Sequence, residues 1–443
     1  MDLPKALELI EEKEVKELAL QFTDLSGILH TLWVPTQAIS QIMKDGIHTD
    51  GSSLSKMVDV SKSDVKLVPD LNSFVIFPPQ LFDYNVARVV CDIYEPDSNV
   101  PFSLDPRYIL RKVLTSLQDQ LGPKVIGIAS SEIEFFLFEE GEDQHLQLID
   151  NAGYLASPPK DRGTQLRHNI TEALRNIGII IEKHHHEVPA GKSEFNVPYS
   201  EALQMVDTIY LIKFITKLMA NRFGFIASFM PKPFHGEYGA GLHTHINLRD
   251  QEKELNLFSN SSENTKLSPL ARNFLAGILI HAKGLALLTN PSVNSYKRLV
   301  PGWEAPVYIS WANYNRSTLI RIPPGSKKAA RLEYRPTDGS CNFYLAYAGL
   351  FSSGLNGVKL QLKPPTPVEE NIYDMSTDER KKRGIKVLPG NLGEAIFEFS
   401  KDRFFEDVLG SKFVQKYVTL KMSEWKEFSV YVHKWERDRY IDV

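Results

Sequence analysis

Cysteine is nearly absent from the chain, which has only Cys91 and Cys341 among 443 residues. Two cysteines without a CxxC partner cannot build a disulfide framework, and they are typical of a protein from a reducing cytoplasm. An excess of positive charge is also missing, because 51 lysines and arginines face 55 acidic residues for a net charge of −4. This balance argues against a broad nucleic-acid surface. We therefore expect a cytoplasmic protein with no nucleic-acid partner.

Long uninterrupted apolar runs are missing as well. The most apolar stretch, FLAGILIHAKGLALL, contains His281 and Lys283, so it predicts a core helix rather than a membrane span. The opening residues MDLPKALELIEEKEVKEL are acidic and amphipathic, which is not typical of a signal peptide. Phosphate-binding loops are missing too, since the chain has no GxxxxGK[ST] and the glycines of HGEYGAGLH do not fit GxGxxG. A P-loop and a Rossmann site are therefore unsupported, and a nucleotide needs another kind of site.

The predicted elements divide the chain into two parts. A helix over residues 4–12 opens a strand-rich unit of about 100 residues, whose strands are VKELALQF, ILHTLWVP, VKLVPD, SFVIFPP and ARVVCDIY. The loop EPDSNVPFSLDP is dense in Pro, Asp and Ser, and it is the expected domain boundary. Beyond it, helices are predicted over residues 107–121, 200–224, 268–289 and 343–358, with strands between them. Residues 363–390 are polar and contain prolines, so we expect a surface excursion there.

Pairs of glutamates stand out on the predicted strands. In SEIEF, Glu132 and Glu134 are two residues apart, so both side chains point to one face of a strand. The loop 189–192 is predicted to close a hairpin that sets Glu187 opposite Glu194, with Cβ atoms about 5 Å apart. Such carboxylates repel one another unless a cation lies between them.

Two further motifs add imidazoles and arginines to strand faces. His243 and His245 share a face in GLHTHINL, and Arg331, Glu333 and Arg335 share one in RLEYR. Oxygen-rich ligation with an imidazole favours Mg²⁺ or Mn²⁺ over Zn²⁺, and two such ions beside arginines suit phosphoryl transfer. Each motif taken singly also fits a solvated strand face. Their joint occurrence on predicted strands favours a metal site.

A Gly/Pro-broken segment over residues 290–323 contains Arg298, Glu304, Arg316 and Arg321. This composition is typical of an active-site flap followed by a strand, and the alternative is a loop with surface ion pairs. Near residue 50, the sequence DGSS is a turn by composition, in which Asp50 caps a backbone N–H.

The order of the motifs resembles the glutamine synthetase family, class I. The motifs are QFTDLSG, DGSS, SEIEFFLF, HHHEVPAGKSE, FMPKPFHGEYGAGLHTH, NSYKRLVPGWEAP, NRSTLIRIP and RLEYR, and the resemblance runs from about Val15 to the closing WERDRYIDV. It implies an α+β fold with a small N-terminal β-grasp domain (residues 1–102) and a large catalytic domain (residues 103–443). It also implies a cytoplasmic homo-oligomer, a dodecamer of two hexameric rings whose active sites lie between subunits. The sequence leaves open whether a small regulatory protein binds the enzyme.

The resemblance also assigns roles to residues. For the metal ions, two or three per site, the first set is Glu134, Glu187 and Glu194, and the second is Glu132, His243 and Glu333. For the amino-acid substrate the residues are Arg298, Arg335, Gly239 and Tyr238. For ATP and phosphoryl transfer they are Arg316, Arg321, Arg331, His245, Lys328, His185 and Tyr199. For the ammonium pocket they are Asp50, Ser53, Tyr154, Glu187 and Glu304.

The implied reaction is the ATP-dependent ligation of ammonia to the γ-carboxylate of glutamate through γ-glutamyl phosphate, which yields glutamine, ADP and phosphate. In this mechanism Asp50 takes a proton from ammonium, while Glu304 lies on a flap that excludes water. Tyr238 stands where the family has an asparagine that contacts the substrate, so the amino-acid or amine specificity stays open. The alternatives are a γ-glutamyl–amine ligase for a polyamine or ethanolamine, and a non-catalytic homologue.

Overall fold

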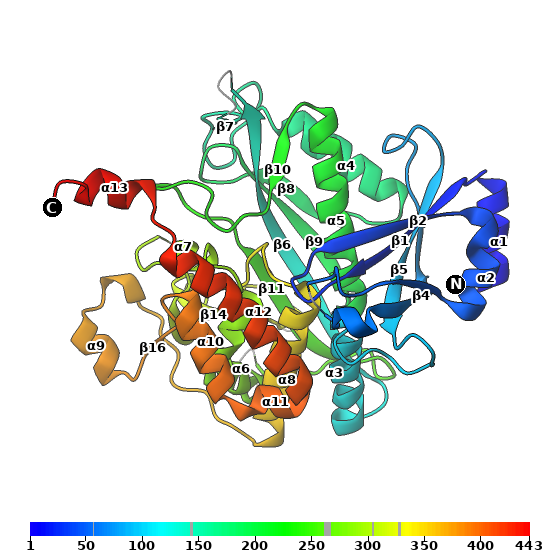
Figure 1. Cartoon of the computed structure of the whole chain (residues 1–443). Coiled ribbons are helices and arrows are strands. Elements are labelled where there is room, and N and C mark those ends of the chain that lie inside the picture. Colours follow the sequence, from blue (N-terminus) through cyan, green and yellow to red (C-terminus); the bar gives the residue numbers. More distant parts are fainter. Residues whose placement is uncertain (56, 142–144, 261–266, 304, 327–328) are drawn as a thin grey trace.

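The computed structural model describes residues 1–55, 57–141, 145–260, 267–303, 305–326 and 329–443. Two β-sheets form its framework, and Figure 1 shows the N-terminal sheet at one side of the molecule and the C-terminal helices at the other. The mixture of helices and two separate sheets confirms the predicted α+β class.

The N-terminal sheet has the strand order β2-β1-β5-β4-β3. In it β1 pairs antiparallel with β2 and parallel with β5. The strands are β1 (Glu17–Thr23), β2 (Leu29–Pro35), β3 (Ile47–Asp50), β4 (Asp64–Ile76) and β5 (Val86–Tyr94). Helices α1 (Leu3–Glu12) and α2 (Ile39–Asp45) contact β4. The sequence predicted separate strands for VKLVPD and SFVIFPP. They form the single strand β4, because a register shift between Asp70 and Val75 keeps the bulged chain paired with β5.

The larger sheet has the order β16-β13-β14-β15-β11-β6-β9-β8, and β7, β10 and β12 pair at its side. Its central strands are β6 (Val125–Glu140), β8 (Lys183–His186), β9 (Lys192–Glu201), β11 (Leu242–Asp250), β13 (Tyr308–Asn313), β14 (Thr318–Ile322) and β15 (Leu332–Tyr334). The short strands are β7 (Leu146–Leu148), β10 (Ile226–Ser228), β12 (Leu255–Asn256) and β16 (Lys386–Val387).

The helices of the second part include all four that apolar spacing predicted. They are α3 (Pro106–Leu121), α4 (Thr164–Asn176), α5 (Ala202–Arg222), α6 (Pro269–Thr289), α7 (Ser295–Arg298), α8 (Phe343–Lys359), α9 (Thr377–Lys382), α10 (Leu392–Lys401), α11 (Arg403–Leu409), α12 (Ser411–Val430) and α13 (Lys434–Tyr440). The four helices predicted from apolar spacing are therefore confirmed, as α3, α5, α6 and α8.

Helices α6 and α8 lie against each other in the core. A Cβ atom on Gly277 would lie 2.1 Å from the Ser353 carbonyl oxygen, and one on Gly357 would lie 2.1 Å from that of Asn273. Only glycine permits so close a contact between the two helix backbones. By length and composition α6 could cross a membrane, yet 72% of its most apolar window is buried inside the protein. This burial supports the prediction of a core helix.

Arg107, in the first turn of α3, joins the two parts of the chain. Its guanidinium pairs with Asp70 on β4 at 2.8 Å, with Asp92 on β5 at 2.6 Å and with Asp207 on α5 at 2.8 Å. The arginine side chain is only 3% exposed, and paired burial of this kind is what makes a buried charge tolerable. The arrangement ties the N-terminal sheet to the helices that cover the larger sheet.

Residues 363–390 were expected to form a surface excursion, and the structure corrects this in part. Strand β16 extends the larger sheet through β13, while Ile372 and Leu388 are buried in the core. These two apolar side chains anchor a segment whose composition is otherwise polar.

A carboxylate-rich candidate active site

The candidate site lies on one face of the larger sheet, where five neighbouring strands each contribute charged side chains. The register sets Glu134 opposite Glu194, His243 opposite Glu132, and Glu333 opposite both His245 and Arg321. Directly opposed residues share a face of the sheet, so the pairing gathers charges that are far apart in the sequence. Together they line a cavity of about 180 Å³.

Most residues predicted for the site line this cavity. They are Glu132, Glu134, Tyr154, His185, Glu187, Glu194, Tyr238, Gly239, His243, Arg298, Arg316, Arg321, Glu333 and Arg335. The prediction had brought them together from separate motifs, and the sheet brings them together in space with the loops and the helix α7 beside it.

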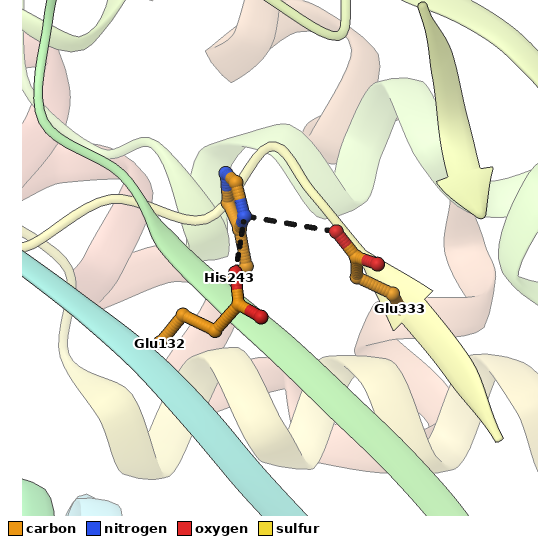
Figure 2. Close-up of side chains that lie close together, drawn as sticks. All are labelled: Glu132, His243 and Glu333. Carbon is orange, nitrogen blue, oxygen red and sulfur yellow. Dashed lines mark hydrogen bonds and ion pairs between the residues drawn. The ribbon is translucent and has the colours of Figure 1, made fainter. Parts of the chain in front are cut away.

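One metal-ligand cluster consists of Glu132 on β6, His243 on β11 and Glu333 on β15, as Figure 2 shows. The Nδ1 atom of His243 lies 3.1 Å from Glu132 Oε2 and 3.6 Å from Glu333 Oε1. Burial opposes the charge on Glu132, but hydrogen bonds from His243 and His245 outweigh it and lower the pKa of this carboxyl. Burial likewise opposes the charge on Glu333, while His245 and His243 lower its pKa. Both carboxylates are thus held in the ionised form that binds a cation.

The other cluster consists of His185, Glu187 and Glu194, whose potential ligand atoms all lie within 4.8 Å of one another. The predicted hairpin register was wrong here: Glu194 lies opposite His185, and the backbone of Glu187 bonds with that of Lys192. The error amounts to two residues, which leaves every side chain on its predicted face because strand side chains alternate with a period of two. Glu187 therefore still reaches the site.

Glu194 distinguishes this second cluster, because its surroundings disfavour the ionised carboxylate. Burial, followed by repulsion from Glu132, Glu134 and Glu187, raises the pKa of the Glu194 carboxyl to about 9. Within the described ranges, no hydrogen bond reaches the Glu194 carboxylate. Buried carboxylates in this situation need a cation, and a set of carboxylate oxygens with one imidazole suits Mg²⁺ or Mn²⁺. The residues present therefore fit a divalent metal site.

Arginines flank the carboxylates on the side of β14 and β15. Arg321 Nε lies 2.5 Å from Glu333 Oε2, and Arg335 Nε lies 3.2 Å from Glu333 Oε1. Arg298 donates from Nη2 to the Arg335 carbonyl oxygen at 3.2 Å and from Nη1 to the carbonyl oxygen of Pro336. Burial lowers the pKa of Arg298. The cationic side chains give the cavity the means to bind carboxylate and phosphate groups.

The loop before β11 passes very close to Arg298. A Cβ atom on Gly239 would lie 2.8 Å from Arg298 Cγ, and one on Gly241 would lie 2.5 Å from Arg298 Nη2. Glycine thus makes room for the aliphatic stem of Arg298 at position 239 and for its guanidinium at position 241. Next to them, the Tyr238 ring meets the Trp303 ring edge-on, with centroids 6.0 Å apart, and both rings line the cavity.

Known families match both parts of this architecture. The family model described as "Glutamine synthetase, catalytic domain" matches residues 103–440, and "Glutamine synthetase, beta-Grasp domain" matches residues 14–96. The chain belongs to the glutamine synthetase family. The predicted family, the β-grasp and catalytic architecture, and the class of glutamate–ammonia ligases are thereby confirmed. The domain boundary between residues 102 and 103 stays a prediction.

Relatives within the glutamine synthetase family span the whole chain. The glutamine synthetase of Thermotoga maritima is 43% identical over 436 residues and covers 98% of each chain. The enzyme of Thermus thermophilus is 40% identical over 441 residues, again with 98% of each chain covered. A solved structure described as "Apo GmaS without ligand" has a TM-score of 0.88 at 29% identity and covers 100% of both chains. One described as "GmaS/ADP complex-Conformation 1" also has a TM-score of 0.88 at 29% identity, covering 98% of this chain and 99% of that one.

Some residues assigned by the glutamine synthetase resemblance lie beside the cavity. His245 Nε2 contacts Glu132 Oε1 at 3.2 Å, and Arg331 Nε donates to His245 Nδ1 at 3.4 Å. Tyr199 is 43% exposed and lines a neighbouring cavity of about 650 Å³ between β9 and α5. Glu304 and Lys328 lie outside the described residues.

Asp50 and Ser53 lie in the N-terminal sheet region and do not line the cavity of their own chain. The Asp50 carboxylate is exposed and accepts hydrogen bonds from Ser52 N at 2.8 Å and Ser53 Oγ at 2.8 Å. Hydrogen bonds from the hydroxyls of Ser52 and Ser53 lower the pKa of Asp50. The turn predicted for DGSS is therefore present, and the same bonds hold the aspartate ionised.

Four cavity residues were missed by the sequence reasoning, namely Lys183, Lys192, Trp303 and Ala305. Lys192 could have been found, because it precedes Glu194 by two residues on the same strand and so shares its face. Trp303 carries no such signal, since it lies in a loop whose position depends on contacts with distant residues.

Proposed function

We propose that this chain forms glutamine from glutamate, ammonia and ATP through γ-glutamyl phosphate. The proposal is carried by one observation: all six carboxylate and imidazole positions assigned to the metal ions are filled and line one cavity. Full-length relatives named glutamine synthetase support it. It places the enzyme in the cytoplasm, in nitrogen metabolism and glutamine biosynthesis, with two or three Mg²⁺ or Mn²⁺ ions and ATP at each site.

The first ion in this scheme is held by Glu134, Glu187 and Glu194, and the second by Glu132, His243 and Glu333. When bound, such ions neutralise charge on the phosphate oxygens of ATP during transfer to the γ-carboxylate of glutamate.

Arginine side chains supply the remaining positive charge that the negatively charged substrates need. Arg335 has a buried Nη1 atom without a hydrogen-bond partner among the described residues, so it is poised to hold a substrate carboxylate next to Arg298 and the Gly239 loop. Arg316, Arg321 and Arg331 would orient the phosphates.

The ATP and ammonium sites complete the scheme. His245, Lys328, His185 and Tyr199 serve ATP. Asp50, Ser53, Tyr154, Glu187 and Glu304 form the ammonium pocket, in which Asp50 takes the proton that frees ammonia for attack on the acyl carbon.

The proposed scheme also includes assembly of several subunits, and the place of Asp50 supports it. In the proposed scheme a neighbouring subunit supplies Asp50 and Ser53, as in a dodecamer of two rings, and their absence from the cavity lining of their own chain supports this. Exposed apolar side chains support a subunit interface: α13 extends away from the body (Figure 1), with Trp435 62% exposed and Ile441 74% exposed. Exposed large apolar side chains at the C-terminus are consistent with a surface that a neighbouring subunit covers.

A second candidate is a γ-glutamyl–amine ligase that takes a larger amine. The aromatic pair of Tyr238 and Trp303 in the cavity favours it. The filled metal clusters weigh against a non-catalytic homologue.

Product identification by mass spectrometry tests the proposal. The purified protein is given ATP, Mg²⁺ and glutamate with ammonium, methylamine, ethanolamine or putrescine in separate reactions. Glutamine from ammonium, with little product from the other amines, is the expected result. A γ-glutamyl amide formed only from a larger amine would replace the proposal with the second candidate.

A further inference from the structure

Residues 368–373 form a short segment, which we name the brace, that contacts the chain next to two cavity residues. The two cavity residues are Ala305, in the loop before β13, and Arg316, in the connection between β13 and β14. Val368 and Ile372 anchor the brace in the core, with exposed fractions of 6% and 0%. The brace therefore has a fixed position from which it can hold both loops.

The side chain of Tyr373 reaches the first of these loops. Its hydroxyl donates to the carbonyl oxygen of Ala305 at 2.8 Å, and its ring meets the ring of Tyr308 at a centroid distance of 6.0 Å. The same carbonyl oxygen accepts the backbone N–H of Val307 at 2.9 Å. A hydroxyl group from a distant segment thus helps to fix the backbone at the cavity wall.

The backbone of the brace holds the two neighbours of Arg316. Asn315 Nδ2 donates to two carbonyl oxygens of the brace, both at 2.8 Å, and Ser317 Oγ accepts the backbone N–H of Ile372 at 3.1 Å. Among the residues that the structure describes, no hydrogen bond or ion pair involves the Arg316 guanidinium. Its place at the cavity therefore depends on the anchors of its neighbours.

We propose that the brace positions the cavity wall for phosphoryl transfer, with Tyr373 holding the Ala305 loop and Asn315 and Ser317 linking Arg316 to the same segment. Tyr373 is a positioning residue in this scheme, because it acts through the backbone of Ala305 and does not itself line the cavity. The inference deepens the proposed function and rests on it only for the role of Arg316 beside the phosphates.

Hydrogen–deuterium exchange of the full-length protein, read by mass spectrometry, tests whether the brace holds the wall. In Tyr373→Phe, which removes only the hydroxyl, amides of residues 305–318 should exchange at least about threefold faster, as expected for the loss of one hydrogen bond. Tyr417→Phe is the matched control: the Tyr417 hydroxyl donates to the carbonyl oxygen of Leu287 at 3.2 Å, and neither residue lines the cavity. Unchanged exchange over residues 305–318 in Tyr373→Phe would overturn the inference.

Steady-state kinetics tests whether the position of the wall matters for the reaction. Tyr373→Phe and Ser317→Ala should each lower kcat about three- to tenfold, while the KM for ATP changes by less than about twofold. This split is expected because the wall acts during the transfer rather than in the binding of the nucleotide. A contact that only stabilises the fold leaves the kcat of the folded protein unchanged, as expected for Tyr417→Phe. An unchanged kcat in both brace variants would rule out the positioning role.

The double variant Tyr373→Phe/Ser317→Ala tests whether the brace acts as one unit. Because the loss of either contact already loosens the shared segment, the double variant should lower kcat by clearly less than the product of the two single effects. A loss equal to that product would show two independent contacts and would refute a common brace.

The exchange measurement does not depend on the reaction. A protein that shows the expected exchange but makes no glutamine refutes the proposed function alone. A protein that makes glutamine, with unchanged exchange in Tyr373→Phe, refutes only this inference.

Discussion

Replacing Arg107 with methionine should destabilise the protein strongly. The guanidinium of Arg107 is 3% exposed and pairs with Asp70, Asp92 and Asp207, whose side chains are 14%, 17% and 11% exposed. Removing one partner of a buried charge cluster leaves uncompensated carboxylates and costs about 3–5 kcal/mol. Arg111 also contacts Asp70 and Asp92. In the variant these two carboxylates therefore keep a positive partner, and Asp207 is the one whose charge is left uncompensated.

Chemical denaturation at pH 7, followed by circular dichroism and fluorescence, measures the free energy of unfolding of Arg107→Met. The double variant Arg107→Met/Asp207→Asn is the matched control, since it also removes the stranded charge and should recover part of the loss. A loss below about 1 kcal/mol in the single variant would refute the reasoning, because it would place the three aspartates in effectively aqueous surroundings.

The pH dependence of this effect has a definite sign. Burial raises the pKa of Asp70, but the attraction of Arg107 outweighs it and lowers the pKa overall. A depressed folded-state pKa contributes stability that is present above the unfolded value of about 3.9 and is lost as the pH falls. The difference between the unchanged protein and Arg107→Met should therefore be largest near neutral pH and should shrink below about pH 4.

Three further changes test the site and the assembly. Tyr238→Ala removes the edge contact with Trp303, worth about 0.5–1.5 kcal/mol, so steady-state kinetics should show a several-fold higher KM for the amino-acid substrate with kcat little changed. An unchanged KM contradicts a binding role. Glu194→Gln should raise the melting temperature of the metal-free protein, because it relieves the repulsion between Glu194 and the neighbouring glutamates. The same change should abolish the stabilisation by Mn²⁺. If Mn²⁺ stabilises the variant as much as the unchanged protein, Glu194 is not a ligand. Deletion of residues 431–443 should reduce the size of the assembly in light scattering, and an unchanged mass contradicts an interface at α13.

One more change tests the support of the metal cluster. His186 is buried between Asp150 Oδ1 at 3.1 Å and the carbonyl oxygen of Glu187 at 2.7 Å, so it fixes the backbone that carries Glu187. His186→Asn should weaken Mn²⁺ binding about tenfold, as losses beside a metal site generally do. Calorimetry of Mn²⁺ binding measures this effect, and an unchanged affinity shows that the contact only stabilises the fold.

Residue parity along strands made much of the site predictable. Glu132 and Glu134, or His243 and His245, stand two residues apart, and that spacing assigns them to one face wherever a strand forms. The same parity protected the position of Glu187 when the hairpin register was wrong by two residues. Helices with long apolar periodicity, such as α3 and α8, were likewise predictable because periodicity is a local property.

Contacts between distant segments were beyond local reasoning. The union of VKLVPD and SFVIFPP into β4 depends on continued pairing with β5 across a bulge. The anchoring of residues 363–390 depends on Ile372 and Leu388, which are buried against other elements.

By itself the sequence determined the kind of chemistry: a surplus of carboxylates, with imidazoles and arginines, on strand faces. Tertiary structure alone decided which strands are neighbours, that His185 faces Glu194, and that the Lys192 ammonium lies between Glu134 and the Gly239 loop. The physical reason is that side-chain direction follows from the local backbone, whereas strand order and register follow from pairing between segments whose separation along the chain carries no local signal.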